Sequence, residues 1–335
     1  MDSVAAAQTL SEIGYLLRQD AKETYRARAF SAASWTIALE RPDLDALGKA
    51  GQLTSISGVG AGIAKVLDEL ITTGSSRYLE RLRVESGQPS RDDETVIDLA
   101  QYQGDVHSHT KWSDGRATML EMAEGARSLG YRYLAVTDHS PRIKVVNGLD
   151  AVRLLAQSQE MAEVQQQVEG LTLLQGIEVD ILEDGALDLP DQVLEILDIV
   201  IASPHVKLRQ EPAAMTERML RAVSHPHVDL IGHPTGRRPG SREGATYDFD
   251  LVFREAAKHG VALEIDCDPA RMDLSPEMAR LAAELGCNFV LSSDAHAPAE
   301  LAYVPMAAWM ARRAGIPQQR ILNWNLDRKF APSRS

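Results

Sequence analysis

The stretch from Gly104 to Ser140, GDVHSHTKWSDGRATMLEMAEGARSLGYRYLAVTDHS, decides the fold class of this chain. Its ends are typical of short buried strands, at Asp105–His107 and Tyr133–Thr137, and the apolar residues of Met119–Leu129 repeat at helical spacing. A strand, a helix and a second strand in this order predict a βαβ unit with parallel strands. A histidine stands at or just beyond the end of each strand.

The same alternation continues towards the C-terminus. Five further candidate strands are Leu173–Glu178, Ile199–Ala202, Val228–Ile231, Val261–Ile265 and Phe289–Leu291. Amphipathic helices are predicted between most of the strands, among them Ala151–Val168, Met215–Val223 and Pro276–Leu285. Seven strands alternating with helices predict an α/β barrel one strand short of the usual eight. A doubly wound open sheet is the alternative.

The part of the chain before the barrel has a different pattern. Residues 1–83 carry apolar side chains at helical spacing in segments that turn signals separate, which predicts a small all-α domain. Residues 84–103 are polar and predict a linker. We therefore expect a helical domain over 1–83, a linker over 84–103, a barrel domain over 104–325 and a C-terminal tail over 326–335.

Composition bounds the class of protein. A chain of 335 residues suits two domains. Its formal net charge of −13 argues against broad nonspecific binding of nucleic acid, although a local basic surface remains compatible with it. The two cysteines, Cys267 and Cys287, are too few for a disulfide framework and are expected to be small buried side chains. The sequence shows no signal peptide and no membrane-spanning run, which predicts a cytoplasmic protein.

Histidines and acids stand at or just past the end of nearly every predicted strand, and six of the nine histidines belong to this set. Strand ends are where an α/β barrel builds its active site. Imidazoles and carboxylates that converge there predict a multi-metal centre. The predicted ligands are His107, His109, Asp114, His139, Glu178, His205, His233, Asp294 and His296.

The spacing within this set strengthens the prediction. His107 and His109 are two residues apart, so both imidazoles lie on one face of an extended segment. Such a pair alone is more often structural, but Asp294 and His296 repeat it after the last strand, which neighbours the first strand in a barrel. For His139, a helix cap supplied by Asp138 or Ser140 is the alternative to a ligand, and both can hold, because Asp138 could orient the His139 imidazole.

The motifs that carry these residues resemble those of the polymerase and histidinol phosphatase (PHP) superfamily. The closest likeness is to the C-terminal PHP domain of bacterial family X DNA polymerases, and it covers about residues 104–325. The matching segments, in order, are Asp105–Gly115, Thr137–Ser140, Gly176–Asp180, Ser203–His205, Gly232–Arg237 and Ser293–His296.

The resemblance implies a distorted (β/α)7 barrel that holds three divalent metal ions, which are zinc, manganese or iron, with Glu178, Asp294 and His109 as catalytic residues. One metal would take His107, His109, Glu178 and Asp294; a second would take Asp114, His139 and His296; the third would take His205 and His233, with Glu178 bridging. One stretch departs from the family: Glu264-Ile-Asp-Cys-Asp-Pro269 carries aspartates where the family often has asparagines.

The helical region resembles the helix-hairpin-helix domain that opens family X polymerases. Gly58, Val59 and Gly60 would expose backbone N–H groups at a helix N-terminus to a DNA phosphate. The lysine that the family uses for lyase chemistry falls at Val66, with Lys65 beside it, so we expect no lyase activity. Only a linker separates the two domains, so we expect no polymerase activity either.

The sequence therefore predicts a metal-dependent phosphoesterase in which a water of lowered pKa attacks phosphorus. The leading prediction is DNA 3′-end processing by a 3′→5′ exonuclease. The alternative is a phosphatase for a small phosphomonoester such as histidinol phosphate, and a noncatalytic DNA-binding protein ranks below both. The basic residues predicted to bind substrate phosphate are Arg237, Lys207, Arg209, Lys111 and Arg271.

Overall fold

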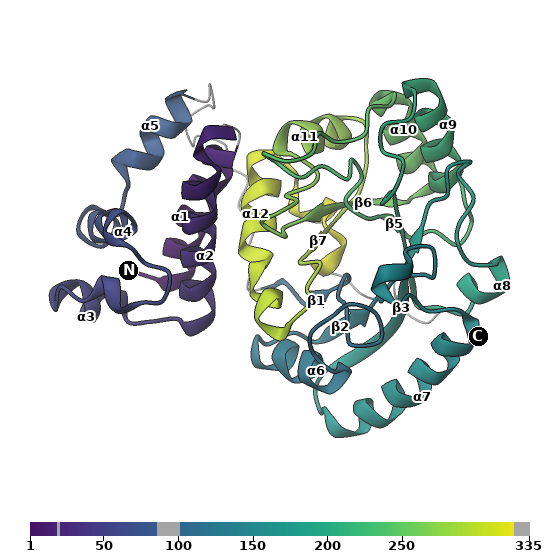
Figure 1. Ribbon diagram of the computed structural model, residues 1–335, viewed down its shortest axis with the longest axis horizontal. Coiled ribbons are helices and arrows are strands. Elements are labelled where there is room, and N and C mark those ends of the chain that lie inside the picture. Colours follow the sequence, from purple (N-terminus) through teal and green to yellow (C-terminus); the bar gives the residue numbers. More distant parts are fainter. Residues whose placement is uncertain (19–20, 86–100, 325–335) are drawn as a thin grey trace. The chain divides into compact units, whose positions relative to one another are not determined.

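The computed structural model describes residues 1–18, 21–85 and 101–324, and these form two compact units (Figure 1). Most of the predicted linker at 84–103 and all of the predicted tail at 326–335 lie outside the described residues, so the domain boundaries stay predictions. None of the described helices is both long enough and apolar enough to cross a membrane.

The first unit is helical throughout its described residues. Its helices are α1 (Ser3–Arg18), α2 (Thr24–Glu40), α3 (Leu44–Lys49), α4 (Ala61–Thr73) and α5 (Arg77–Glu85), with short 3-10 helices at Ala21–Glu23 and Leu53–Ser55. The helices α1 and α2 pack along each other, and their apolar faces form much of the core of the unit.

A buried ion pair ties α5 to α1. The guanidinium of Arg83 donates from Nε to Oε1 of Glu12 over 2.6 Å and from Nη2 to Oε2 over 2.8 Å. Both side chains are at most 5% exposed, and Arg83 also donates from Nη1 to Oε1 of the more exposed Glu80 over 2.7 Å.

The second unit is built on seven parallel strands in the sequential order β1 to β7. They are β1 (Gly104–Asp105), β2 (Tyr133–Val136), β3 (Thr172–Asp180), β4 (Ile199–Ser203), β5 (Leu230–Ile231), β6 (Ala262–Asp266) and β7 (Phe289–Ser292). All seven predicted strands are thereby confirmed. A sequential order excludes the doubly wound alternative, in which the strand order reverses.

The two outer strands meet just beyond their carboxyl ends. Ser108 and Ala295 form a parallel bridge, and the N–H of His109 donates to the carbonyl of Ala295 over 2.8 Å. A second contact lies at the ends of the same strands, where the Ser293 hydroxyl donates to Oδ2 of Asp105 over 2.5 Å. These contacts nearly close the sheet into a seven-stranded barrel, as the sequence predicted.

Helices surround the barrel (Figure 1). They are α6 (Met119–Ser128), α7 (Ala151–Gln167), α8 (Asp191–Leu194), α9 (Pro212–Val223), α10 (Phe249–His259), α11 (Pro276–Glu284) and α12 (Val304–Arg313), with 3-10 helices at Lys144–Val146, Pro298–Tyr303, Gln318–Arg320 and Leu322–Trp324. The four helices that the sequence analysis named are present, with small differences in their ends. Both cysteines are buried, as expected.

The interior of the barrel is apolar at one end and acidic at the other. A buried cluster includes Leu174 of β3 and Ala262 of β6. Because side chains alternate along a strand, Glu178 and Glu264 face the same side of the sheet as these two residues. Both glutamates are fully buried. The strands therefore place carboxylates at the carboxyl-terminal end of the barrel interior.

Candidate metal centre

The nine predicted ligands converge at the carboxyl end of the barrel, with Glu178 at their centre. Its Oε1 lies 2.8 Å from Nε2 of His233 and 3.1 Å from Nε2 of His205. Its Oε2 lies 2.9 Å from Nδ1 of His139 and 3.5 Å from Nε2 of His107. The two oxygens thus face different imidazoles, so Glu178 could serve as a ligand together with either group of histidines.

Asp294 faces the histidine pair that follows β1. Its Oδ1 lies 2.9 Å from Nε2 of His109 and 3.6 Å from Nε2 of His107. The backbone of Asp294 has a φ of 52°, in the left-handed region that a residue other than glycine rarely adopts. The turn after β7 therefore holds this carboxylate in a constrained position against the two imidazoles.

A third group lies at the edge of the site around Asp114. Its Oδ1 is 3.5 Å from Nε2 of His296, 3.6 Å from Nε2 of His139 and 4.0 Å from Nδ1 of His109. Asp114 lies in the loop between β1 and α6, and its side chain is 30% exposed, so this part of the site faces solvent.

Among the described residues, three sets of donor atoms are compact enough to hold an ion, each with its ligand atoms within 4.8 Å of one another. They are His107, His109 and Asp294; His109, Asp114, His139 and His296; and His139, Glu178 and His205. The first and second sets follow the predicted groupings closely. The third places His139 beside Glu178 and His205, while His233 contacts the same Glu178 oxygen as His205.

The donor atoms fit metal ions in their chemistry as well as in their spacing. Within the described residues, both oxygens of Glu178 and one or both ring nitrogens of His107, His109, His139, His205 and His233 are buried without a hydrogen-bond partner. A buried polar atom left in this state costs about 1–3 kcal/mol. Divalent cations would satisfy these atoms, because imidazole and carboxylate are the ligands that zinc, manganese and iron take.

The electrostatics of the cluster separate the imidazoles into two kinds. Burial and the neighbouring His296 and His139 lower the pKa of His109 to about 3. Burial also acts to lower the pKa of His139, but Glu178 and Asp114 outweigh it and raise the pKa to about 10. His109 is therefore neutral and ready to ligate, whereas His139 carries a proton that a cation must displace.

Several ligands are oriented by acids that lie behind them. Oε1 of Glu264 is 2.6 Å from Nδ1 of His107, and Oδ1 of Asp180 is 3.0 Å from Nδ1 of His205. Such contacts fix the ring orientation and leave Nε2 to face the centre. Asp180 ends the Gly176–Asp180 motif noted in the sequence, whereas no role was predicted for Glu264. The position of Glu264 could have been predicted: it stands two residues after the apolar Ala262 on β6, so its side chain points to the same face of the sheet.

Asp138 has a different role from the ones expected. Its carboxylate accepts hydrogen bonds from the Thr110 backbone and hydroxyl at 2.8 and 2.7 Å, from the Ser113 hydroxyl at 2.5 Å and from Gln157 at 2.7 Å. Within the described residues, it neither caps a helix nor hydrogen-bonds to the His139 ring. Asp138 instead holds the loop that carries Asp114 against α7.

The basic residues predicted to bind phosphate divide into two classes. Lys111, Lys207 and Arg209 are exposed, in the loops after β1 and β4. Arg237 donates from Nε and Nη2 to the Met272 carbonyl, and the buried Arg271 lies 2.9 Å from Asp294. Phosphate binding by any of the five stays a prediction.

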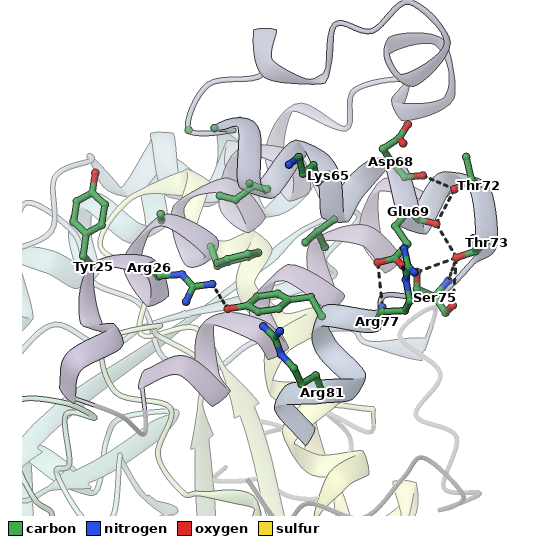
Figure 2. A pocket seen from close by; sticks show the side chains of 18 residues that line it. Tyr25, Arg26, Lys65, Asp68, Glu69, Thr72, Thr73, Ser75, Arg77 and Arg81 are labelled. Carbon is green, nitrogen blue, oxygen red and sulfur yellow. Dashed lines mark hydrogen bonds and ion pairs between the residues drawn. The ribbon is translucent and has the colours of Figure 1, made fainter. Parts of the chain in front are cut away.

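The residues predicted to bind DNA lie where α4 begins. Gly58 has a φ of 79°, which favours glycine, and Gly60 is the residue that precedes the first turn of α4. Both glycines line a pocket of 1490 Å³ within the helical unit (Figure 2). Val59 is buried, so the backbone and not this side chain would meet a phosphate.

Basic and aromatic side chains share this pocket. Figure 2 shows Arg26 and Arg81 reaching into it from α2 and α5, with Lys65 on α4. The guanidinium carbons of Arg26 and Arg81 lie 5.3 and 5.0 Å from the centre of the Tyr78 ring. Tyr25 is 85% exposed at the rim.

The chain matches the family model described as the PHP domain over residues 105–266. It is 41% identical over 242 residues to the DNA polymerase/3′-5′ exonuclease PolX of Bacillus subtilis, and this match covers 71% of the chain and 42% of that protein. The chain thus spans less than half the length of this relative. It is also 31% identical to a probable phosphatase of Thermoanaerobacter sp., over 67% of the chain and 91% of that protein.

A crystal structure of histidinol phosphate phosphatase from Lactococcus lactis, in complex with zinc, L-histidinol and phosphate, aligns with a TM-score of 0.41 at 15% identity. It covers 58% of the chain and 86% of that protein, which is too distant a likeness to bear on the substrate. The family match, the two sequence relatives and the seven-stranded barrel agree. The chain belongs to the PHP family of metal-dependent phosphoesterases.

Proposed function

We propose that this phosphoesterase processes DNA 3′ ends as a 3′→5′ exonuclease. The observation that carries the proposal is the basic and aromatic pocket of the helical unit, with Gly58 and Gly60 in its lining. Backbone N–H groups at a helix start suit phosphates, and aromatic rings interleaved with arginines suit unstacked bases. The 41% identity to a relative named as a polymerase and 3′-5′ exonuclease supports the same substrate class.

The helical unit would attract DNA through a local cluster of positive charges and not through its overall charge. Residues 1–90 contain 10 lysines and arginines against 11 acids, so the unit as a whole has no excess of positive charge. The pocket lining holds four cations, Arg26, Lys65, Arg77 and Arg81, and two acids, Asp68 and Glu69. Because Arg77 is paired with Glu69, binding would depend on the other three cations and on stacking against exposed Tyr25. We expect modest affinity with a shallow salt dependence, because few phosphates are neutralised.

In the barrel, the proposed ligand set provides the chemistry. Divalent cations bound there would supply Lewis acidity and a water of lowered pKa. The protein side chains would position the cations. Glu178 offers one oxygen to each of two groups of imidazoles, and Asp294 lies next to His107 and His109. Lys207 and Arg209, on the exposed loop after β4, are proposed to meet the substrate phosphates.

A phosphatase for a small phosphomonoester is the second candidate. It is favoured by the relative from Thermoanaerobacter, which the chain covers over 91% of its length and which is named a probable phosphatase. The acidic net charge of −13 also suits a small substrate better than a long polyanion. In this case the helical unit would be dispensable for turnover.

The two candidates are separated by assaying the purified chain with Mn²⁺ on 3′-labelled and 5′-labelled DNA and, in parallel, on histidinol phosphate. An exonuclease of the proposed polarity releases the 3′ label at once and shortens the 5′-labelled strand stepwise. Both reactions should disappear in Glu178→Gln. Turnover of the small ester with intact DNA would refute the proposal and favour the phosphatase.

The contribution of the helical unit is tested by Arg26→Met. This variant should raise KM for DNA and leave hydrolysis of p-nitrophenyl phosphate unchanged, because only the polymer reaches the pocket. Arg254→Met on α10, an exposed arginine paired with Asp250, is the matched control. An unchanged KM for DNA in Arg26→Met would remove the pocket from the proposed function.

A further inference from the structure

We propose that Arg271 is a positioning residue, which fixes one oxygen of Asp294 so that only the other faces the metal centre. The proposal rests on the metal centre described above, in which Asp294 is a ligand. It gives Arg271 a role different from phosphate binding. The basis is the division of the Asp294 carboxylate between two sets of partners.

The two oxygens of Asp294 contact different partners. Oδ1 lies 2.9 Å from Nε2 of His109 and 3.6 Å from Nε2 of His107. Oδ2 lies 2.9 Å from Nε of Arg271, in an ion pair that lacks hydrogen-bond geometry. With Oδ2 beside the guanidinium, Oδ1 is the oxygen next to the two imidazoles.

Arg271 has a second acidic neighbour. Its Nε lies 3.5 Å from Oδ2 of Asp266, and the arginine side chain is only 9% exposed. Asp266 is fully buried, and its other oxygen accepts the N–H of Asp268 over 2.7 Å. The same nitrogen of Arg271 therefore contacts two carboxylates that are both withdrawn from solvent.

The segment that presents Arg271 is fixed by its backbone. Asp266 and Asp273 form an antiparallel bridge, in which the two N–H groups donate to the opposite carbonyls over 2.6 and 3.1 Å. The Asp273 carboxylate accepts from the backbone N–H and the hydroxyl of Thr235, each over 2.9 Å. The segment thus returns onto the end of β6 and leaves Arg271 little freedom to move towards a substrate.

The energetics favour this assignment over phosphate binding. If Arg271 turned to a substrate phosphate, the phosphate would compensate the guanidinium, but the carboxylate of Asp294 would lose its cationic partner. To bind a substrate phosphate, Arg271 would have to give up Asp294 and so disturb a ligand at the moment of catalysis. An arginine that stays on Asp294 instead sets the orientation of the ligand before metal or substrate arrives.

Metal affinity and ligand geometry test the proposal on the full chain. The variants are Arg271→Met, Arg271→Lys and, as control, Arg254→Met. Affinities for Mn²⁺ are measured by chelator competition, and the ligand field is recorded from the visible absorption of Co²⁺. We expect Arg271→Met to weaken the binding of one ion by about 10–100-fold and to shift the Co²⁺ bands, because Oδ2 is released. Arg271→Lys, which keeps the charge, should recover part of the affinity.

The opposite pattern would overturn the proposal. If Arg271 binds phosphate, Arg271→Met will keep the wild-type metal affinity and Co²⁺ spectrum and raise KM for p-nitrophenyl phosphate. If Arg271→Met fails to fold, Arg271→Lys decides: wild-type metal affinity and spectrum would contradict positioning. A wild-type chain that binds metal but cleaves no DNA would refute the exonuclease and leave this test readable, whereas a chain that binds no metal would refute both.

Discussion

Oε1 of Glu264 lies 2.6 Å from Nδ1 of His107, and neither side chain is exposed to solvent. The same glutamate oxygen accepts the Ser292 hydroxyl over 2.5 Å, so the acid is held from β7 as well. A carboxylate on Nδ1 makes that nitrogen the protonated one and leaves Nε2 as a lone-pair donor. Nε2 is the atom that faces Glu178 and Asp294.

Replacing Glu264 by glutamine should therefore weaken metal binding without removing a ligand. The amide can rotate its NH₂ towards Nδ1 and favour the wrong tautomer of His107. We expect a loss of about 10–100-fold in affinity for one ion. Chelator competition measures it, with Glu277→Gln on α11 as the control. Equal affinities in Glu264→Gln and wild type would show that the contact does not orient His107.

Metal binding should release protons and strengthen as the pH rises. Without metal, the pKa of His139 is about 10 and that of His296 about 9, both raised by neighbouring acids against the effect of burial. Below pH 9 both imidazoles hold protons that a cation must displace, so affinity falls as the pH falls from 9 to 7. Titration calorimetry in buffers of different ionisation enthalpy counts the released protons. An affinity independent of pH over this window would contradict the raised pKa values.

The helical unit should depend strongly on the ion pair between α1 and α5. The Glu12→Gln variant removes the bidentate carboxylate from the buried Arg83, which keeps Glu80 as an acidic partner. We expect a loss of about 1–3 kcal/mol in the free energy of unfolding of this unit. Denaturant titration measures this loss, as a shift in the unfolding transition of the first unit. Glu85→Gln, whose ion pair with Arg81 is largely exposed, should change stability by less than about 1 kcal/mol.

A methyl group at Gly232 should destabilise the barrel. An ideal Cβ at this position would overlap the Ser203 hydroxyl and approach Cγ2 of Ile201 to 2.7 Å. Overpacking of this kind costs about 1–3 kcal/mol, so Gly232→Ala should lower the thermal midpoint of the second unit. Gly62 on α4 has nothing within 4 Å of such a Cβ, and Gly62→Ala should be neutral or slightly stabilising. Equal thermal midpoints for Gly232→Ala and wild type would mean that the surrounding structure accommodates the methyl group without loss of stability.

The sequence predicted the barrel because its strands are short apolar runs with a polar side chain after each. This pattern is local, so β2 at Tyr133–Val136 and β7 at Phe289–Ser292 could be placed within a residue or two. It also predicted the convergence of the ligands, since parallel strands bring their carboxyl ends to one edge. The approach of the ends of β1 and β7 was expected from the seven-strand barrel and not from any motif.

What the sequence could not predict are contacts that depend on tertiary folding. The approach of Arg271 to Asp294 requires the segment after β6 to fold back as the Asp266–Asp273 bridge, which no local periodicity encodes. For the same reason, Asp138 looked like a cap or a partner of the next residue, although its partners Thr110 and Gln157 are 28 and 19 residues away. A side chain that acts by positioning another residue has no fixed spacing from it in the sequence, so sequence motifs do not reveal it.

The bridge between Ser108 and Ala295 connects the ends of the first and the last strand of the barrel. His109 and Asp294 are 185 residues apart in the chain, so a chain emerging from the ribosome exposes the histidine pair long before its aspartate exists. Contacts of such separation slow folding, because a long loop must close before they form. The completed centre would then form only at the end of folding, and binding at full affinity would report that the ring has closed.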